Sequence, residues 1–432
     1  MKRIIAATGI VISSLLTANG QEGIWNGKLD IQGRKLSVVF HLDREQPTMD
    51  SPNQGVKGIA IQVEKGIMGK TTIKAPTIGM TYEGMWLNDR IIGTFEQFNQ
   101  EFPLTLTPGP VRLLRPQTPI GPFPYSTEEV SFRNGEYVFN GTLTVPEKYT
   151  RNTPVLLMIT GSGQQNRDEE LFDHKPFAVI ADALARAGYA SLRYDDRGYG
   201  SKELNPLEWT MEDFKTDACA GIDFLKARFE TIGVIGHSEG GTIAMMLAAE
   251  DKVDFIVSLA GMTVSGAETL VEQNRTALLG AGISEETVDS YCKLINEAFN
   301  IRMNGGYMPD PEQFNIPEYL MRNYYAVVSL IQTPYMKNFL KMDIRPIIGN
   351  ISCPILALNG TKDIQVNNKT NLNVLRDAIK LNKLNIIEEI EGVNHLFQHC
   401  TSGAITEYGE IEETFSPEVL EMIIKWLKAL DY

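Results

Sequence analysis

The stretch that most constrains the fold covers residues 231–250, TIGVIGHSEGGTIAMMLAAE. It begins with a short apolar run, continues through a Gly-rich turn and ends in small residues typical of a closely packed helix. The turn, residues 236–240, matches G-x-S-x-G, in which a sharp strand-to-helix turn lifts a Ser hydroxyl out of a sheet. Glycines flank the Ser because a Cβ at either position would collide with neighbouring backbone. We therefore predict a strand, an elbow bearing the nucleophile Ser238, and a helix whose free N–H groups face the reaction centre.

From residue 154 to 261, and again from residue 353, apolar strands alternate with helical segments. This alternation predicts an α/β domain with a mostly parallel, doubly wound sheet covered by helices on both faces. Besides the elbow strand, we expect strands at 155–160, 189–194, 253–261, 353–360 and 384–390 and helices at 176–187, 211–229, 371–381 and from Ser416 onward.

Residues 262–350 interrupt that alternation, because they contain no comparable apolar strand. The periodicity predicts amphipathic helices at 266–279 and 284–299 and one or two more within 317–340. The segment is rich in Met and aromatic residues. We interpret it as a helical lid inserted between two strands of the sheet.

Residues 21–115 have a different pattern, with β-branched and alternating apolar residues punctuated by Gly and Pro. Two such runs, 80–86 and 90–95, flank a short turn and predict a hairpin. We expect a small all-β domain, an antiparallel sheet or partial barrel of about five to eight strands. A Pro-rich stretch at 116–126 is typical of a linker, and the catalytic domain would then occupy 127–432.

The first 20 residues have the pattern of a secretory signal peptide. Lys2 and Arg3 form a basic start, residues 4–16 form an apolar run too short to span a bilayer, and small residues follow at 18–20. We expect cleavage and export to the periplasm or the extracellular space. An uncleaved N-terminal anchor is the alternative.

Composition narrows the choice of partners. The 432 residues carry a net charge of −14, which argues against nucleic acid and anionic membranes. No later stretch is long and apolar enough for stable membrane insertion. The four cysteines form neither a disulfide framework nor a metal-binding cluster with His, so we expect no metal or organic cofactor.

A Ser nucleophile requires a base and an acid that orients the base. His395 lies in a loop directly after the last predicted strand, and Asp363 follows the strand at 353–360. Both would lie at the carboxyl edge of the sheet, where Ser238 also lies. The order Ser238, Asp363, His395 is that of the α/β-hydrolase triad. His399, four residues beyond His395, is the competing base.

An oxyanion intermediate requires two backbone donors. Glu239, the residue after the nucleophile, is expected to supply one. The Gly-rich loop at 160–169 is expected to supply the other through Gly163, with Gln164 as the alternative. In the loop after the next strand, we expect Asp195 and Arg197 to brace the loops beside the site.

Three segments together, 161–169, 193–198 and 236–240, resemble the α/β-hydrolase superfamily. Within it they are similar to a bacterial group of carboxylesterases and serine-aminopeptidase-like hydrolases that carry a β-rich N-terminal segment. The resemblance covers about residues 127–432. Gln164 replaces a Pro that is common in the related oxyanion-loop pattern, which alters loop stiffness but leaves the donors.

The leading hypothesis is therefore a secreted serine carboxylesterase that forms an acyl-enzyme on Ser238. The Met- and aromatic-rich segment favours a small ester with an apolar or aromatic part. An aminopeptidase or acylaminoacyl-type serine peptidase is the nearest alternative. An inactive secreted binding protein is the alternative from another class. The sequence does not define the oligomeric state.

Overall fold

The computed structural model describes residues 23–31, 34–42, 45–54, 56–87, 89–109, 114–201 and 204–432. The chain forms two compact units, residues 1–112 and 113–432. The predicted signal peptide lies outside the described residues and stays a prediction. Among the described residues, no helix is long and apolar enough to cross a membrane.

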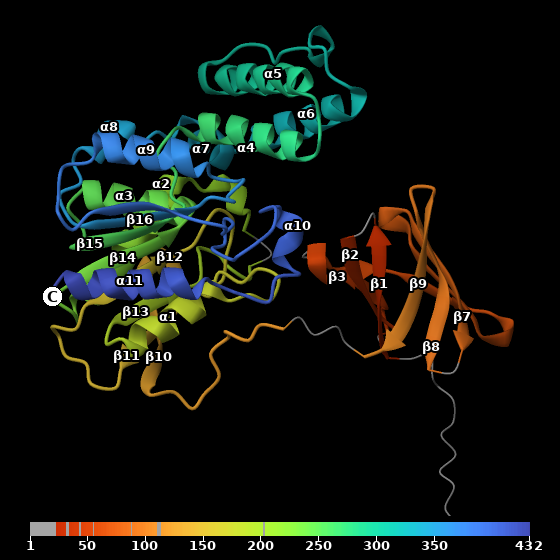
Figure 1. Cartoon of the computed structure of the whole chain (residues 1–432), viewed down its shortest axis with the longest axis horizontal. Coiled ribbons are helices and arrows are strands. Elements are labelled where there is room, and N and C mark those ends of the chain that lie inside the picture. The colour runs from red at the N-terminus through yellow and green to blue at the C-terminus, as the bar shows by residue number, and fades with distance from the viewer. Residues whose placement is uncertain are drawn as a thin grey trace, which may run out of the picture. The chain divides into compact units, whose positions relative to one another are not determined.

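The first unit is an antiparallel sheet whose neighbours follow the order β4-β3-β2-β1-β9-β8-β7-β6-β5 (Figure 1). Strands that follow one another in the chain are also neighbours in the sheet, except β4 and β5, which form its two edges and are separated in the chain by Ile61 alone. The sheet therefore curls back on itself around a core that includes Phe40, Tyr82 and Ile91. Its strands are β1 Ile24–Ile31, β2 Arg34–His41, β3 Thr48–Ser51, β4 Val56–Ala60, β5 Gln62–Lys65, β6 Lys70–Ala75, β7 Met80–Leu87, β8 Arg90–Gln97 and β9 Gln100–Pro108.

The predicted number of strands in this unit was too low, since nine are present in its described part. The expected hairpin is β7–β8, whose alternate residues are buried. The strands that a pattern search misses are short. β4 is mostly exposed, so it lacks the alternation of buried and exposed residues by which a strand is recognised in a sequence.

The second unit contains an eight-stranded sheet in the order β10-β11-β13-β12-β14-β15-β16-β17. Strands β12 to β17 pair in parallel, while β10 and β11 form an antiparallel edge. The predicted mostly parallel α/β sheet is thus confirmed. Its strands are β10 Tyr125–Asn134, β11 Tyr137–Pro146, β12 Val155–Ile159, β13 Ala190–Tyr194, β14 Ile232–His237, β15 Phe255–Leu259, β16 Ile355–Gly360 and β17 Ile386–Ile390.

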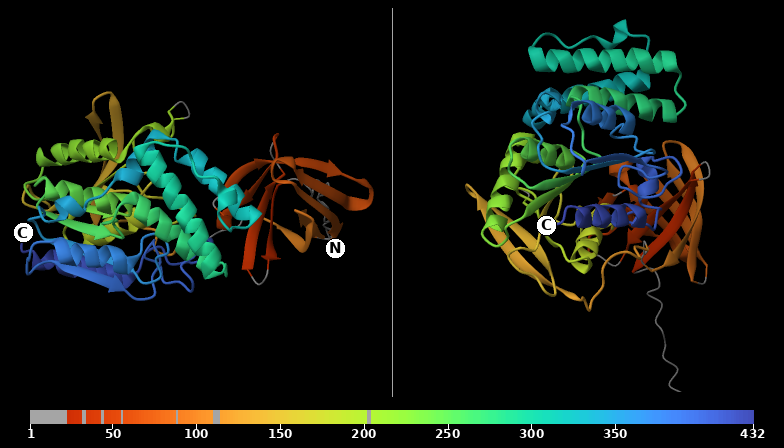
Figure 2. Two further views of the ribbon diagram at one scale, coloured as in Figure 1. Left: turned by 90° about the horizontal axis from the view of Figure 1, so that it is seen from above. Right: turned by 60° about the vertical axis from the view of Figure 1, so that its left-hand side comes forward.

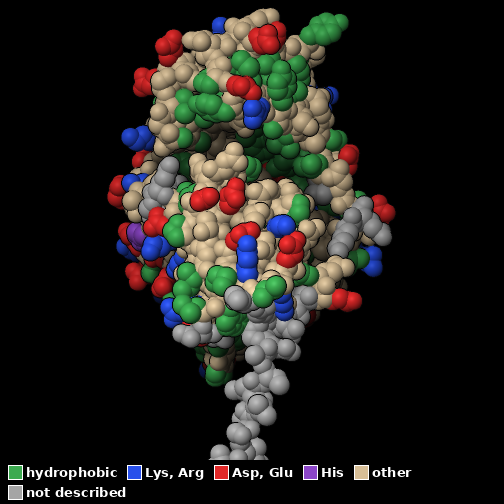
Figure 3. All heavy atoms as spheres, turned by 90° about the vertical axis from the view of Figure 1, so that its right-hand side faces the viewer, with side chains coloured by type: hydrophobic (Ala, Val, Ile, Leu, Met, Phe, Trp, Pro, Cys, Tyr) green, Lys and Arg blue, Asp and Glu red, His purple; other side chains and the backbone are tan. Residues whose placement is uncertain are grey.

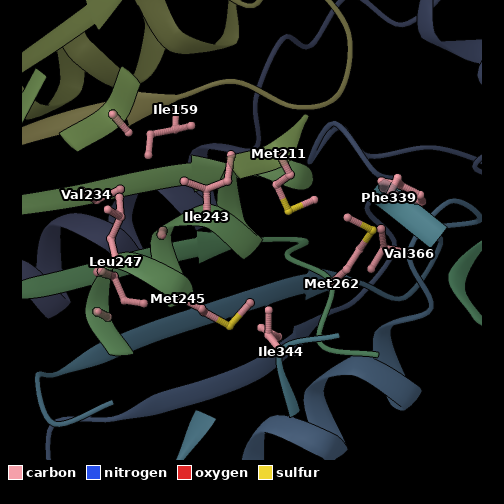
Figure 4. Packing of buried hydrophobic residues seen from close by; sticks show 14 of the residues in the cluster. Ile159, Met211, Val234, Ile243, Met245, Leu247, Met262, Phe339, Ile344 and Val366 are labelled. Carbon is pink, nitrogen blue, oxygen red and sulfur yellow. The ribbon is translucent and has the colours of Figure 1, made fainter. Parts of the chain in front are cut away.

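Helices cover both faces of this sheet (Figures 1 and 2). Helices α1 and α11 pack on one face, and α2, α3, α8 and α9 lie on the other. Figure 4 shows the core on the face covered by α2, α3, α8 and α9, where Ile243 and Leu247 of α3 pack against Val234 of the sheet. The helices are α1 Pro176–Arg186, α2 Met211–Lys226, α3 Glu239–Ala249, α8 Arg345–Ile348, α9 Asn368–Ala378, α10 Ile405–Tyr408 and α11 Pro417–Ala429.

Between β15 and β16, where the sequence predicts a helical segment, the chain forms four helices before α8. They are α4 Gly266–Gly280, α5 Glu285–Asn304, α6 Glu318–Leu330 and α7 Pro334–Lys341. Helices α5 and α6 lie farthest from the sheet, and hydrophobic side chains gather on their surface (Figures 1 and 3). Tyr319 and Tyr325 of α6 are among the exposed aromatic residues. Helices α4 and α7 lie closer to the sheet.

The Pro-rich stretch before β10 is held against the second unit. The Arg115 guanidinium donates hydrogen bonds to the carbonyls of Phe172 and Gly409, and the Gln117 amide donates to the Phe415 carbonyl at 2.7 Å. The start of the segment expected to be a linker is therefore bound both to the loop before α1 and to loops from the C-terminal part of the chain.

Candidate active site

Ser238 occupies a strained turn between β14 and α3. Its φ of 54° and ψ of −116° are unusual for a non-Gly residue. A Cβ on Gly236 would lie 2.1 Å from the Gly240 carbonyl oxygen, and one on Gly240 would lie 2.1 Å from the Ile159 carbonyl oxygen. The Ser238 N–H donates to the Leu259 carbonyl on the neighbouring strand at 2.8 Å. Both glycines are thus required by backbone contact, and the turn projects Ser238 from the sheet.

Asp363 and His395 form a buried pair in the loops after β16 and β17. The His395 Nδ1 lies 2.7 Å from Asp363 Oδ2. The other carboxylate oxygen accepts the backbone N–H groups of Gln365 and Val366, which fixes its orientation. An ionised carboxylate only accepts hydrogen bonds, so Nδ1 carries the proton and Nε2 is left as the acceptor. This is the tautomer that a general base requires.

Ser238 and His395 line the same cavity, whose volume is about 380 Å³. Helices α4, α6 and α7 contribute much of its wall, and Figure 4 shows Met262, Phe339 and Val366 close together at this end of the core. The apolar lining residues are Leu171, Met262, Leu270, Leu330, Met336, Phe339, Val366 and Leu396. The uncharged polar ones away from the nucleophile are Gln165, Thr269, Gln273, Tyr335 and Gln365.

The competing base, His399, is not among the residues that line this cavity. Its Nδ1 contacts Glu413 at 2.8 Å, and half of its side chain is exposed. The structure therefore brings His395, and not His399, to Ser238.

The loop after β12 approaches the Ser238 cavity through its first residues. Gly161 and Ser162 line the cavity with Ser238, whereas Gly163 lines a separate, smaller cavity beside Glu239. The chain turns at Gly163, where φ is 97°. The Gly161 N–H is already bound to Glu169 at 2.7 Å, so a second oxyanion donor from this loop must come from a later residue. The use of Gly163 as that donor stays a prediction, and the cavity lining adds Ser162 as a candidate.

Glu239 lies at the start of α3, as predicted, but its side chain has an unexpected environment. The carboxyl group is buried, and Oε2 accepts hydrogen bonds from the Ser162 hydroxyl at 2.9 Å and from the Tyr335 hydroxyl. Burial raises the pKa of this carboxyl, while the two hydroxyl donors act in the opposite direction. The side chain does not line the Ser238 cavity.

A second buried acid–imidazole pair, which the sequence did not reveal, lies in the wall of the same cavity. Glu169 Oε1 accepts the Gly161 N–H at 2.7 Å and lies 2.9 Å from His237 Nδ1. The His237 Nε2–H donates to the His395 carbonyl at 2.8 Å. Burial alone lowers the pKa of His237, but the charge and hydrogen bond of Glu169 outweigh burial and raise it. The pair therefore connects the loop after β12 to the loop that carries His395.

Asp195 and Arg197 brace the surrounding loops, as expected. Asp195 forms an ion pair with Arg167 of the loop after β12 at 2.6 Å. Arg197 forms a buried ion pair with Asp217 of α2 at 2.6 Å and stacks on the Tyr137 ring. Neither residue lines the cavity that contains Ser238.

Comparison with known proteins reveals relatives among hydrolases. Residues 174–289 match the family model described as serine aminopeptidase, S33. Esterase EstD of Thermotoga maritima is 24% identical over 308 residues, which are 68% of each chain. Est1E from Butyrivibrio proteoclasticus is 17% identical over 69% of this chain and 99% of its own, with a TM-score of 0.39. Proline iminopeptidase from Mycobacterium smegmatis is 15% identical over 70% of this chain and 98% of its own, with a TM-score of 0.45.

Proposed function

We propose that this chain is an α/β-hydrolase and an exported serine esterase that hydrolyses uncharged carboxylic esters. The proposal rests on one arrangement: Ser238 and the Asp363-bound His395 share a cavity whose remaining walls are mainly apolar. Export rests on the predicted signal peptide alone.

The chemistry follows from the protonation states of these groups. His395 Nε2 removes the Ser238 proton as Oγ attacks the ester carbonyl, and Asp363 stabilises the imidazolium. The Glu239 N–H at the start of α3 would hold the oxyanion together with one N–H of the loop after β12, that of the predicted Gly163 or that of Ser162, which lines the cavity. His395 then protonates the departing alcohol, and water attacks the acyl-enzyme by the same steps.

The charge of the cavity favours an ester over a peptide with a free amino terminus. Such a substrate carries an ammonium group, which needs an available carboxylate nearby. Among the described residues, Glu169 is the one acid in the cavity lining. Its Oε1 already accepts the Gly161 N–H and contacts His237 Nδ1 at 2.9 Å, so this carboxyl group is engaged and is not available to a substrate ammonium group. The remaining wall suits an uncharged substrate.

The inserted helices would serve as a lid over Ser238. Helices α4, α6 and α7 contribute Leu270, Leu330 and Phe339 to the cavity, and these side chains suit an apolar or aromatic acyl or alcohol group. A cavity of about 380 Å³ is at the small end for small-molecule sites, so a compact ester is expected.

An aminopeptidase or acylaminoacyl peptidase remains the second candidate, because the family model over residues 174–289 is described as a serine aminopeptidase. A catalytically inactive binding protein is the third reading, and the Ser238, Asp363 and His395 geometry argues against it.

Paired substrates separate these candidates. Purified protein would be assayed on p-nitrophenyl esters from acetyl to decanoyl and on aminoacyl and acylaminoacyl p-nitroanilides. We expect ester turnover that disappears in Ser238→Ala and persists in Ser402→Ala, an exposed Ser outside the cavity. Faster turnover of the anilides would support the peptidase. Absence of both activities, with no fluorophosphonate labelling of Ser238, would support the binding protein.

A further inference from the structure

One buried carboxyl group connects three separate parts of the second unit. Glu239 directly follows Ser238, and its side chain is 2% exposed. Its Oε2 accepts from Ser162 of the loop after β12 and from Tyr335 of α7, which is 96 residues away in the chain. Through this oxygen, an inserted helix is joined to the nucleophile turn and to the loop that approaches Ser238.

The two hydroxyl groups have an electrostatic role at this position. A bare carboxylate beside the Glu239 N–H would oppose the negative charge that develops on a substrate oxyanion. Hydrogen bonds from Ser162 and Tyr335 disperse that charge. Burial and the neighbouring carboxyl hold the pKa of Tyr335 well above its ordinary value, so its hydroxyl retains the proton that it donates.

Tyr335 also defines the position of one cavity wall. Its ring lines the cavity, and so do Met336 and Phe339 of the same helix. Helix α7 is only eight residues long, so a fixed point at Tyr335 limits the movement of all three side chains. The position of α7 therefore determines the space available to the acyl group.

We propose that Tyr335 is a positioning and specificity-determining residue. Its hydroxyl, through Glu239, fixes α7 against the nucleophile turn. This contact determines the position of the oxyanion donors and the position of the wall that binds the acyl group. The proposal rests on the esterase function proposed above. It predicts that the Tyr335 hydroxyl acts through Glu239 and not by contacting substrate.

The Tyr335→Phe variant tests this, because it keeps the ring and removes one hydroxyl. We expect kcat to fall roughly tenfold, as for loss of a hydrogen bond to a buried group. The ratio of kcat/KM for hexanoyl to acetyl ester should change about threefold or more as the wall relaxes. Tyr319→Phe and Tyr325→Phe on exposed parts of α6 are the controls, and both should match the wild type.

A double-mutant cycle identifies the path of the effect. Glu239→Gln keeps an oxygen acceptor for the two hydroxyl groups, so its kcat should fall less than that of Glu239→Ala. Glu239→Ala should resemble Tyr335→Phe, and the double variant should be no slower than Glu239→Ala alone. A full further loss on adding Tyr335→Phe to Glu239→Ala would mean that the hydroxyl acts on substrate, and would overturn the proposal. Unchanged kcat and chain-length ratio in Tyr335→Phe would overturn it as well.

Amide hydrogen exchange separates this proposal from the esterase function itself. Exchange in the α7 peptide 334–341 should quicken in Tyr335→Phe, with no change in α11. Faster exchange in Tyr335→Phe, with no ester hydrolysis by the wild type, would support the contact between α7 and Glu239 and refute the proposed esterase function. Unchanged exchange in Tyr335→Phe, with ester hydrolysis by the wild type, would refute the role of that contact and leave the proposed esterase function standing.

Discussion

Replacing Glu169 by Ala should destabilise the second unit more than any nearby surface change. The variant removes the acceptor for the Gly161 N–H and leaves His237 without its buried partner. The side chains of His237 and Glu169 are only 8% and 7% exposed, so water cannot readily replace the lost contacts. Breaking a buried pair in this way costs about 3–5 kcal/mol. We expect the lower end, about 3 kcal/mol, because neutral His237 can still donate to the His395 carbonyl.

The assay is thermal unfolding followed by circular dichroism. At roughly 2–4 °C per kcal/mol, a loss of about 3 kcal/mol lowers Tm by about 6–12 °C. Glu169→Gln should lose much less, since its amide can accept from Gly161 and donate to neutral His237. Glu170→Ala is the matched control, because this neighbouring acid is partly exposed and its contacts, with Lys175 at 3.6 Å and with the Asn166 amide at 3.3 Å, are long. A Glu169→Ala protein that melts within about 1 °C of Glu170→Ala would refute the reasoning.

The pH dependence of the same variant has a defined sign. The pKa of His237 is raised in the folded protein, so its contribution is fully present below the unfolded pKa, about 6.5, and is lost as pH rises through the folded value. The difference in Tm between wild type and Glu169→Ala should therefore be largest below about pH 6.5 and shrink at higher pH. A difference that grows with rising pH would contradict the assignment of His237 as a stabilising cation.

Three further predictions concern the site. Asp363→Asn should lower kcat by about 10³–10⁴ with the fold retained, as judged by circular dichroism, because the tautomer of His395 is no longer fixed. His399→Ala should stay within about twofold of wild-type kcat in the same ester assay, since this residue is outside the cavity; a loss comparable to that of His395→Ala would reassign the base. Gly236→Ala should cost at least about 3 kcal/mol in urea unfolding, because its Cβ would lie 2.1 Å from a backbone oxygen; wild-type stability would contradict the close packing of the turn.

The catalytic edge of the sheet was predictable because its residues stand at fixed places in a regular pattern. A parallel sheet brings the carboxyl ends of its strands to one edge, so Ser238, Asp363 and His395 could be placed together without knowing any contact. The flanking glycines of the turn were predictable for the same reason, since only one strand-to-helix geometry requires them at that spacing.

The contacts around that edge depend on geometry that no local pattern records. Which N–H of the loop after β12 faces the cavity depends on how the chain turns at Gly163, where φ is positive, and a Gly-rich pattern does not record that turn. Glu169 and His237 are 68 residues apart, and a charged residue in a Gly-rich loop gives no sign that it will be buried. Tyr335 and Glu239 are likewise joined only by the way in which the inserted helices return to the sheet.

The central claim is that Ser238 accepts the acyl group of an ester and that His395 and Asp363 enable it. The most direct measurement is intact mass spectrometry of protein quenched within milliseconds of mixing with p-nitrophenyl hexanoate. We predict one added hexanoyl group on wild-type protein, located on the peptide that contains Ser238, and none on Ser238→Ala. Turnover of the ester with the acyl group on another residue, or with undiminished rate in Ser238→Ala, would contradict the account.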